Sequence, residues 1–150
     1  MRDSVKVSET TTSEQTKAIQ GAMDHKICII TGGAGVGKTT VISEIVKNLN
    51  IRGLRYRLLS FTGKAVSRLK EVTGSNKCST IHRFLNKSRA ETDVIIIDEA
   101  SMVTDALMHQ LFDTCRINRI VLVGDPNQLE PIGWGKFFKE LVKSETIPCY

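Results

Sequence analysis

The chain has 150 residues, of which 41% are hydrophobic and 25% charged, a composition typical of a globular protein with one domain and its own core. No apolar run has the length of a membrane span, and the polar N-terminus lacks the apolar segment of a secretory signal, so we expect neither a membrane protein nor a secreted one. The net charge of +5 suits a polyanionic partner without identifying one.

The four cysteines are widely spaced and form no C-x-x-C pair, which argues against a zinc site and against a disulfide framework. We therefore expect reduced thiols. The compartment expected from this is the cytoplasm, or a nucleus-like compartment if the source is eukaryotic or viral.

In chain order, residues 1–10 are polar and are expected to form a flexible lead-in, and residues 11–150 one domain. Capping residues, stop signals and apolar periodicity predict helices over residues 11–22, 41–49, 62–72, 80–85, 104–115 and 134–142. Apolar runs predict strands over residues 25–31, 54–60, 94–97 and 120–123.

Strands that alternate with helices predict a parallel α/β sheet. The unbroken branched-chain runs at 94–97 and 120–123 are typical of strands that are buried on both faces. Right-handed crossover connections place ligands at the carboxyl ends of such strands, and the loops that follow the predicted strands are polar. The candidate site is therefore expected at that edge of the sheet.

Residues 32–40 fit the phosphate-binding pattern G-x-x-x-x-G-K-[ST], and they lie between a predicted strand and a predicted helix, as this loop requires. Glycines allow backbone N–H groups to point at phosphate oxygens, Lys38 brings positive charge to the β- and γ-phosphates, and Thr39 offers a hydroxyl to Mg²⁺. A chance glycine-rich turn would not account for both flanking elements. The predicted nucleotide-binding residues of the loop are Gly33, Ala34, Gly35, Val36, Gly37, Lys38, Thr39 and Thr40.

Two further strand ends carry residues suited to nucleotide hydrolysis. Asp98 and Glu99 follow the run at 94–97, where Asp98 would hold Mg²⁺ and Glu99 would orient and deprotonate the attacking water. Gln128 follows the last predicted strand and would sense the γ-phosphate. Each segment alone could be a plain polar turn. Together with the phosphate loop they predict one site whose catalytic residues are Lys38, Asp98, Glu99 and Gln128.

These motifs, in this order, resemble the first motor lobe of superfamily-1 helicases of the RecD-like branch, from about residue 13 to residue 138. The resemblance is carried by residues 13–19, 33–40, 62–69, 79–83, 98–103 and 124–131. It implies a RecA-like fold, ATP and Mg²⁺ as ligands, and 5′→3′ translocation on single-stranded DNA, with RNA not excluded. It also implies that Gln15, upstream of the phosphate loop, contacts adenine.

The resemblance further implies two segments that contact nucleic acid, with Phe61, Thr62, Gly63, Lys64, Arg68, Thr80 and His82 as contact residues. Lys64 and Arg68 lie four residues apart, so they would share a helix face that neutralises phosphates, although a solvated basic helix has the same pattern. Phe61 suits either base stacking or a place in the core. His82 belongs to a residue type that is more often a structural hydrogen-bonding partner.

Helicases of this family need two RecA-like lobes, and the second supplies arginines that stabilise the transition state. No candidate for such an arginine follows Arg119, so we expect the second lobe to be absent from this chain, to come from the same parent protein, and ATP hydrolysis by the chain alone to be weak. Two other hypotheses stay open. One is a nucleotide-dependent nucleic-acid-binding switch without unwinding, and the other is a small-molecule kinase, against which the lack of a lid segment argues.

Overall fold

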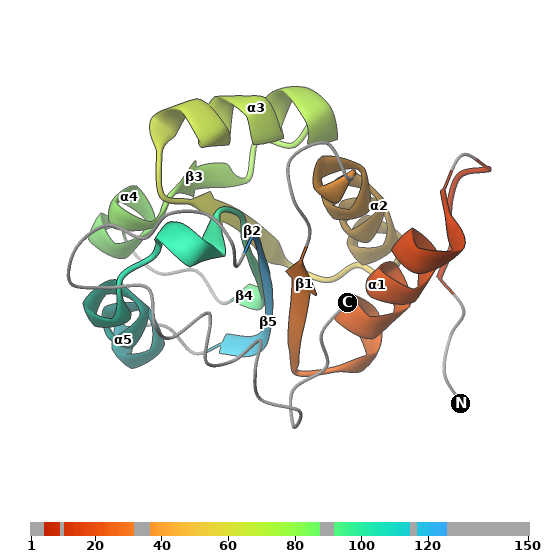
Figure 1. Cartoon of the computed structure of the whole chain (residues 1–150). Coiled ribbons are helices and arrows are strands. Elements are labelled where there is room, and N and C mark those ends of the chain that lie inside the picture. The colour runs from red at the N-terminus through yellow and green to blue at the C-terminus, as the bar shows by residue number, and fades with distance from the viewer. Residues whose placement is uncertain (1–4, 10, 32–36, 88–91, 115–116, 126–150) are drawn as a thin grey trace.

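A computed structural model describes residues 5–9, 11–31, 37–87, 92–114 and 117–125 (Figure 1). Its helices are α1 (Ser13–Asp24), α2 (Lys38–Ile51), α3 (Gly63–Thr73), α4 (Ile81–Asn86), the short 3₁₀ helix η1 (Ala100–Met102) and α5 (Asp105–Thr114). Its strands are β1 (Ile27–Thr31), β2 (Tyr56–Ser60), β3 (Cys78–Thr80), β4 (Thr92–Ile97) and β5 (Ile117–Gly124). The helix predicted over residues 134–142 lies outside the described residues.

All five strands are parallel and form one sheet in the order β1-β5-β4-β2-β3. β5 is the last of the described strands in sequence, yet it lies between β1 and β4, with Val121 beside both Cys28 and Ile96. The predicted parallel α/β sheet is confirmed. β3 was missing from the prediction, because three residues of which two are polar give no periodicity to detect.

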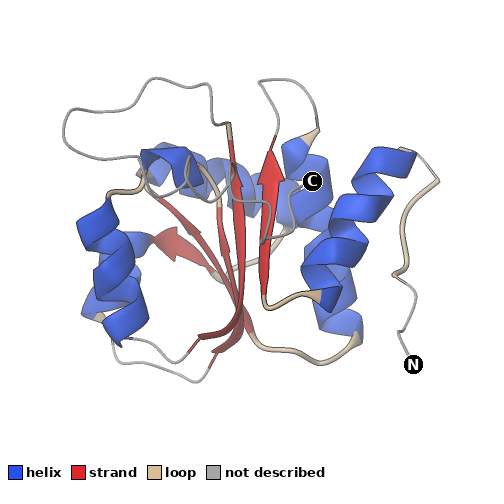
Figure 2. Cartoon of the chain, turned by 60° about the horizontal axis from the view of Figure 1, so that its bottom comes forward, coloured by secondary structure: helices blue, strands red, loops and turns tan. Residues whose placement is uncertain are grey.

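The sheet is buried on both faces, as the branched-chain runs predicted (Figure 2). Alternate residues of β4 divide between two cores: Val94 and Ile96 pack on the side of α1, α2 and α3, whereas Ile95 and Ile97 pack on the side of α4 and α5. This division follows from the two-residue period of a strand. Polar loops are therefore left to the two edges where strands begin and end.

Three threonines begin helices at the points where the sequence predicted them. Thr12 and Gln15 form a capping box at α1, because the Thr12 hydroxyl accepts from the Gln15 backbone N–H and the Gln15 side chain accepts from the Thr12 backbone N–H. Thr62 caps α3, and Thr80 caps α4. Each cap fixes the chain direction where it leaves or enters the site edge, so these local signals position the candidate residues.

Two residues of the predicted lead-in lie against the domain. The Val5 N–H donates to Gln20 Oε1 at 3.2 Å, and the Lys6 N–H donates to Asn48 Oδ1 at 2.8 Å. Asn48 is buried, and its amide returns a 2.8 Å hydrogen bond to the Lys6 carbonyl. The segment next to Lys6 is thus attached to α2 through a satisfied buried polar group.

None of the helices in the described part of the chain combines the length and the hydropathy that a bilayer crossing needs.

Candidate nucleotide and nucleic-acid site

The predicted site segments follow four strands whose carboxyl ends share one edge of the sheet. The phosphate loop follows β1, Asp98 and Glu99 follow β4, and Asp125 follows β5, which lies between them. The segment that begins at Phe61 follows β2, the other neighbour of β4. The acid pair is therefore central, with the phosphate loop on one side and the predicted nucleic-acid segments on the other.

The described part of the phosphate loop begins at Gly37, whose φ of 79° is left-handed. Gln15 Nε2 donates to the Gly37 carbonyl at 3.5 Å, and a Cβ on Gly37 would lie 2.3 Å from the same nitrogen. The backbone angle thus favours glycine, and a larger residue would also have to displace the end of the Gln15 side chain. This contact brings Gln15 to the loop. Residues 33–36 lie outside the described residues.

The first turn of α2 holds the remaining loop residues. Lys38 and Thr39 are half-buried, and Thr40 is exposed. The N-terminus of α2 presents backbone N–H groups and the positive end of the helix dipole toward the site edge. This is the arrangement that binds phosphate.

Asp98 lies at the end of β4, where its backbone N–H donates to the Leu59 carbonyl at 2.8 Å. Burial raises the pKa of its carboxyl group, and the charge of Glu99 adds to the rise. The Glu99 backbone N–H donates to Asp98 Oδ1 at 2.9 Å, and together with the charges of Lys38 and Arg68 it acts in the opposite direction. Because burial disfavours the charged form of this carboxylate, a nearby cation would stabilise that form.

Glu99 has a left-handed φ of 54°, which is uncommon for a residue with a side chain. Its Oε1 atom accepts from Ser60 Oγ at 2.8 Å and from Thr62 Oγ1 at 3.3 Å. The carboxylate is therefore directed toward the end of β2, and the strained backbone is held by two side-chain donors. Such strain occurs at functional sites.

The donors present fit Mg²⁺. Thr39 supplies a hydroxyl on the first turn of α2 and Asp98 a buried carboxylate, and hydroxyl and carboxylate oxygens are the ligands this hard cation takes alongside substrate phosphates. Among the described residues no group of three or more His, Cys, Asp or Glu side chains forms a metal cluster.

The predicted nucleic-acid residues gather at the ends of β2 and β3. The rings of Phe61 and His82 are 5.9 Å apart between centroids, at an interplanar angle of 59°. Phe61 is also half-buried against the core on the α4 side, so it serves the core while keeping one side toward His82. Thr62 and Thr80 act as helix caps: their hydroxyls accept from the Ala65 and Arg83 backbone N–H groups.

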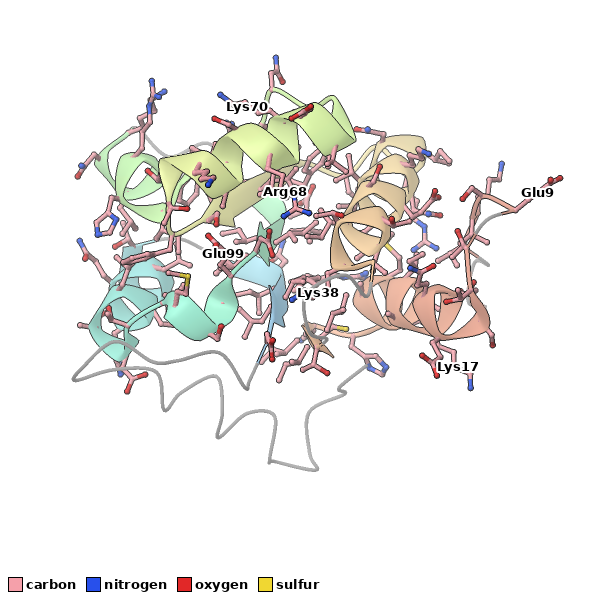
Figure 3. The ribbon with its side chains drawn as sticks, turned by 45° about the horizontal axis from the view of Figure 1, so that its top comes forward. Glu9, Lys17, Lys38, Arg68, Lys70 and Glu99 are labelled. Atoms are coloured by element: carbon pink, nitrogen blue, oxygen red, sulfur yellow. The ribbon has the colours of Figure 1, made fainter. Side chains whose placement is uncertain are left out.

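The first two turns of α3 carry three exposed members of this group. Gly63, Lys64 and Arg68 are all exposed, and a Cβ on Gly63 would meet no atom within 4 Å. Figure 3 shows Arg68 on the same face as Lys38 and Glu99, and its charge lowers the pKa of Asp98. Arg68 therefore reaches the nucleotide side of the site, whereas Lys64 has no such effect on Asp98.

Ser60 is the functional residue that the sequence did not reveal. It is fully buried at the end of β2 and donates to Glu99, but in the sequence it is only a small polar residue after two leucines. Its position opposite the acid pair became visible only through the pairing of β2 with β4. Gln128 lies outside the described residues.

Comparison with known proteins agrees with this architecture. A family model described as an AAA domain matches residues 10–149. The ATP-dependent RecD2 DNA helicase of Deinococcus radiodurans is 37% identical over 133 residues, which cover 81% of this chain and 18% of the relative. The RecBCD enzyme subunit RecD of Mycolicibacterium smegmatis is 31% identical over 167 residues, which cover 87% of this chain and 30% of the relative.

Among solved structures, the crystal structure of the Pif1 helicase from Candida albicans superposes with a TM-score of 0.67 at 24% identity, covering 83% of this chain and 34% of that one. The sheet, the phosphate-loop helix and the acid pair define a RecA-like P-loop NTPase fold. The chain belongs to the AAA domain family, as a motor lobe of the RecD-like helicases of superfamily 1. It spans between about a fifth and a third of the length of these curated relatives.

Proposed function

We propose that this chain binds and hydrolyses ATP with Mg²⁺, and that it forms one lobe of a helicase that moves 5′→3′ along single-stranded DNA. The observation that carries the proposal is the position of Asp98 and Glu99. They lie at the end of β4, two strands from the phosphate loop and one strand from the predicted nucleic-acid segments. A relative that is named as a DNA helicase supports this proposal.

In this proposal the chain's own residues bind the nucleotide as follows. Gln15 contacts the adenine, residues 33–37 and the N-terminus of α2 hold the phosphates, and Lys38 neutralises the β- and γ-phosphates. Thr39 and Asp98 hold Mg²⁺, which when bound neutralises charge on the phosphate oxygens. Glu99 orients the attacking water and accepts its proton, and Gln128 senses the γ-phosphate.

The hydrolysis site would communicate with nucleic acid through Thr62. This residue caps α3 at the start of the predicted contact segment and also donates to Glu99. A strand bound at Phe61, Gly63 or Lys64 would therefore act next to the catalytic carboxylate. Arg68, Thr80 and His82 complete the proposed contacts, with single-stranded DNA as the partner and RNA as an open alternative.

The same link supports a second candidate function, a nucleotide-dependent nucleic-acid-binding switch that does not unwind. In both cases we propose a second RecA-like lobe as partner, from the same parent chain. It would supply the arginines that stabilise the transition state, so ATP hydrolysis by the 150-residue chain alone would be slow. A cytoplasmic or nucleus-like compartment is proposed with this function.

Two variants test the nucleotide part. Lys38→Ala should abolish binding of a fluorescent ATP analogue, because it removes the charge beside the phosphates. Glu99→Gln should retain binding and lose hydrolysis, since it keeps the shape and removes the base. Hydrolysis by Glu99→Gln at the wild-type rate would contradict the proposed role.

Lys64→Ala tests the nucleic-acid part. It should weaken binding of a labelled single-stranded oligonucleotide and flatten the salt dependence of that binding, with ATP binding unchanged. Lys64 is a cleaner probe than Arg68, whose charge also reaches Asp98. The matched control is Lys17→Ala, on the outer face of α1 (Figure 3). Equal DNA affinity for both variants would contradict a contact at α3. A Lys64→Ala chain that bound DNA but gave no DNA-dependent change in ATP hydrolysis would favour the nucleotide-dependent binding switch.

A further inference from the structure

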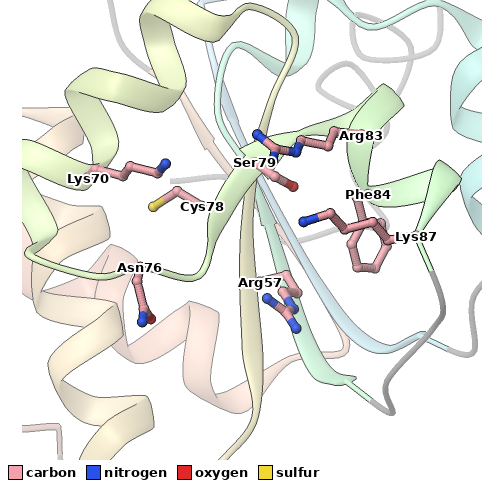
Figure 4. A pocket seen from close by; sticks show the side chains of 8 residues that line it. All are labelled: Arg57, Lys70, Asn76, Cys78, Ser79, Arg83, Phe84 and Lys87. Atoms are coloured by element: carbon pink, nitrogen blue, oxygen red, sulfur yellow. The ribbon is translucent and has the colours of Figure 1, made fainter.

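A pocket of about 290 Å³ lies at the β3 edge of the sheet formed by the described residues, away from the phosphate loop (Figure 4). In the strand order β1 and β3 are the two outermost strands, which puts them roughly 19 Å apart at the usual spacing of about 4.8 Å between strands. The residues of the wall that carry the argument are Arg57, Lys70, Ser79, Arg83, Phe84 and Lys87.

The pocket wraps around the edge strand, with a wall on each face of the sheet. Lys70 comes from α3, on the face that also holds Tyr56 and Leu58. Arg57 lies between these two residues in β2, so it points to the other face, where Lys87 follows α4. Figure 4 shows Lys70 on one side of Ser79, and Arg83 and Lys87 on the other.

The wall is strongly positive. It holds four cations and no carboxylate. Within the described part of the chain, none of the four cationic side chains forms an ion pair. The charge of Lys70 reaches the Cys78 thiol in the wall of the pocket. Burial raises the pKa of this thiol, and the charge of Lys70 opposes that rise. An anion in the pocket would be attracted by the positive charges that line it.

The other groups in the wall favour a phosphate that belongs to a nucleic-acid strand. Arginine side chains and the Ser79 hydroxyl can donate hydrogen bonds to phosphate oxygens. Phe84 is half-buried in the wall, and its ring offers a face to a sugar or base next to the phosphate. β3 has three residues and is too short for a stable added strand, so a peptide held by strand addition would fit this edge poorly.

Ser79 and Arg83 belong to the predicted contact segment 79–83, whereas the rest of the pocket wall extends beyond the predicted contacts at the strand ends. Leu58 pairs with Cys78 and Ser60 with Thr80, so Thr80 and His82 lie at the carboxyl end of β3. Arg57 precedes this register and lies toward the amino end. We propose that this pocket binds a backbone phosphate of a nucleic-acid strand at the β3 edge of the described sheet, as a second contact surface beyond the strand ends. The proposal rests on the nucleic-acid binding proposed above.

The first test compares two double variants of equal charge change in the 150-residue chain. Lys70→Gln with Lys87→Gln removes one exposed cation from each side of the pocket, and Lys17→Gln with Lys26→Gln removes two exposed cations from around α1. Affinity for a labelled single-stranded oligonucleotide is measured by anisotropy over a salt series. The pocket variant should bind about tenfold more weakly at low salt, with a salt slope smaller by about one, and the control should stay within about twofold of wild type.

Arg57→Gln gives a third variant from inside the pocket and should show the same direction of change. Urea midpoints establish that each variant is folded. Basal ATP hydrolysis should be unchanged in all of them, because none of these residues touches the nucleotide site. A pocket variant that binds DNA as well as the control would overturn the proposal.

The second test locates the strand. An oligonucleotide that carries 4-thiothymidine is photocrosslinked to the wild-type chain and the tryptic peptides are mapped. Crosslinks should appear on residues 84–87, which contain Phe84, and separately on residues 58–64, which contain Phe61. Crosslinks on 58–64 without any on 84–87 would overturn the pocket while leaving the proposed function intact. A wild-type chain that binds no single-stranded DNA at low salt would overturn both.

Two competitors identify the ligand class. Inorganic phosphate or polyglutamate is added to the DNA complex and to the free chain. Polyglutamate binding that depends on Lys70 and Lys87 while DNA binding does not would assign the pocket to an acidic peptide. Inorganic phosphate that binds wild type but not the pocket variant, with DNA affinity equal in both, would assign it to a free anion. Either result would contradict the proposal.

Discussion

At the scale of single residues, Asp98 and Glu99 are neighbours in sequence, but the fold places their carboxyl groups in different environments. Burial raises the pKa of the Asp98 carboxyl, whereas the Glu99 carboxylate accepts hydrogen bonds from Ser60 and Thr62. A metal ligand benefits from the first environment, because a cation relieves the buried charge. A base benefits from the second, because its orientation is fixed before substrate arrives.

The raised pKa of Asp98 makes stability depend on pH. The folded state holds this proton more tightly than the unfolded state, so the contribution of Asp98 to the free energy of unfolding is lost as pH rises through the raised pKa. Asp98→Asn removes the buried charge. Without Mg²⁺ it should raise the urea midpoint at neutral pH, and the gain should vanish below the ordinary aspartate pKa of about 4.

The control for this variant is Asp113→Asn, an exposed aspartate in the last turn of α5. It should show no gain that depends on pH. An Asp98→Asn midpoint that differs from wild type by the same amount at every pH would mean that burial of the charge is not the cause.

Ser60 is a positioning residue for Glu99. Ser60→Ala removes the 2.8 Å donor, so the carboxylate keeps only the longer bond from Thr62. Turnover of ATP should fall about tenfold, a part of the 10²–10⁴ typical of general base catalysis, while affinity for a fluorescent ATP analogue is unchanged. Equal loss of affinity and turnover would instead point to a structural role of the buried hydroxyl.

At the scale of elements, α1 and α2 meet at Gly37. A side chain here must adopt a left-handed backbone and displace Gln15, whose other side-chain atom closes the capping box of α1. Gly37→Ala should lower the free energy of unfolding by about 1–2 kcal/mol from the backbone angle alone, and should weaken nucleotide binding. Urea denaturation measures the first effect and ATP-analogue titration the second.

Making Gly37→Ala in a Gln15→Ala chain as well separates the backbone penalty from the steric clash with Gln15. In a Gln15→Ala chain the steric clash is gone and only the backbone penalty remains, so the same substitution should destabilise less. Gly63→Ala is the contrasting control, since its backbone is not left-handed and the added Cβ meets nothing. It should leave stability equal or slightly higher. Identical losses from Gly37→Ala in both backgrounds would exclude the contact with Gln15.

Local sequence patterns predicted helices and buried strands well, but they did not predict how these elements pair with one another. Thr12, Thr62 and Thr80 each cap a helix within reach of their own neighbours in sequence, so their pattern is complete in the chain itself. The buried strands β4 and β5 were likewise evident from unbroken apolar runs. The three-residue β3 carried no period, and its place became clear only from its pairing with β2.

The same distinction between local patterns and contacts distant in sequence applies to the candidate site. Lys38, Asp98 and Glu99 were predicted from motifs, and the fold places them at one edge. The bond from Ser60 to Glu99 and the contact from Gln15 to Gly37 join segments distant in sequence, so no local pattern contains them. The reach of Arg68 toward Asp98 was also outside the prediction, because it depends on how α3 lies over the sheet.

At the scale of the whole molecule, the nucleotide site joins α1, α2 and the centre of the sheet. A bound nucleotide should therefore stabilise the whole fold. With free Mg²⁺–ATP at 100 times its dissociation constant, the free energy of unfolding should rise by about 2.7 kcal/mol, as mass action requires. Thermal unfolding with and without ATP measures the shift.

Removal of Mg²⁺ with a chelator should reduce this stabilisation, and Lys38→Ala should abolish it. Lys17→Ala, remote from the site, serves as the matched control and should retain the full effect. An unfolding temperature of Lys38→Ala that still rises with ATP would place the nucleotide elsewhere.

The order of the sheet also governs how the protein can be made. Among the described strands β1 pairs with β5 alone, so Cys28 gains this neighbour in the sheet only after Val121 has been made. During synthesis, the apolar β1 is already outside the ribosome while the residues up to Gly124 are still to be translated. The strand that precedes the phosphate-binding loop therefore lacks this partner until the residues up to Gly124 have been translated. Until that moment the nascent chain exposes an unpaired apolar strand, which is the kind of segment that chaperones protect.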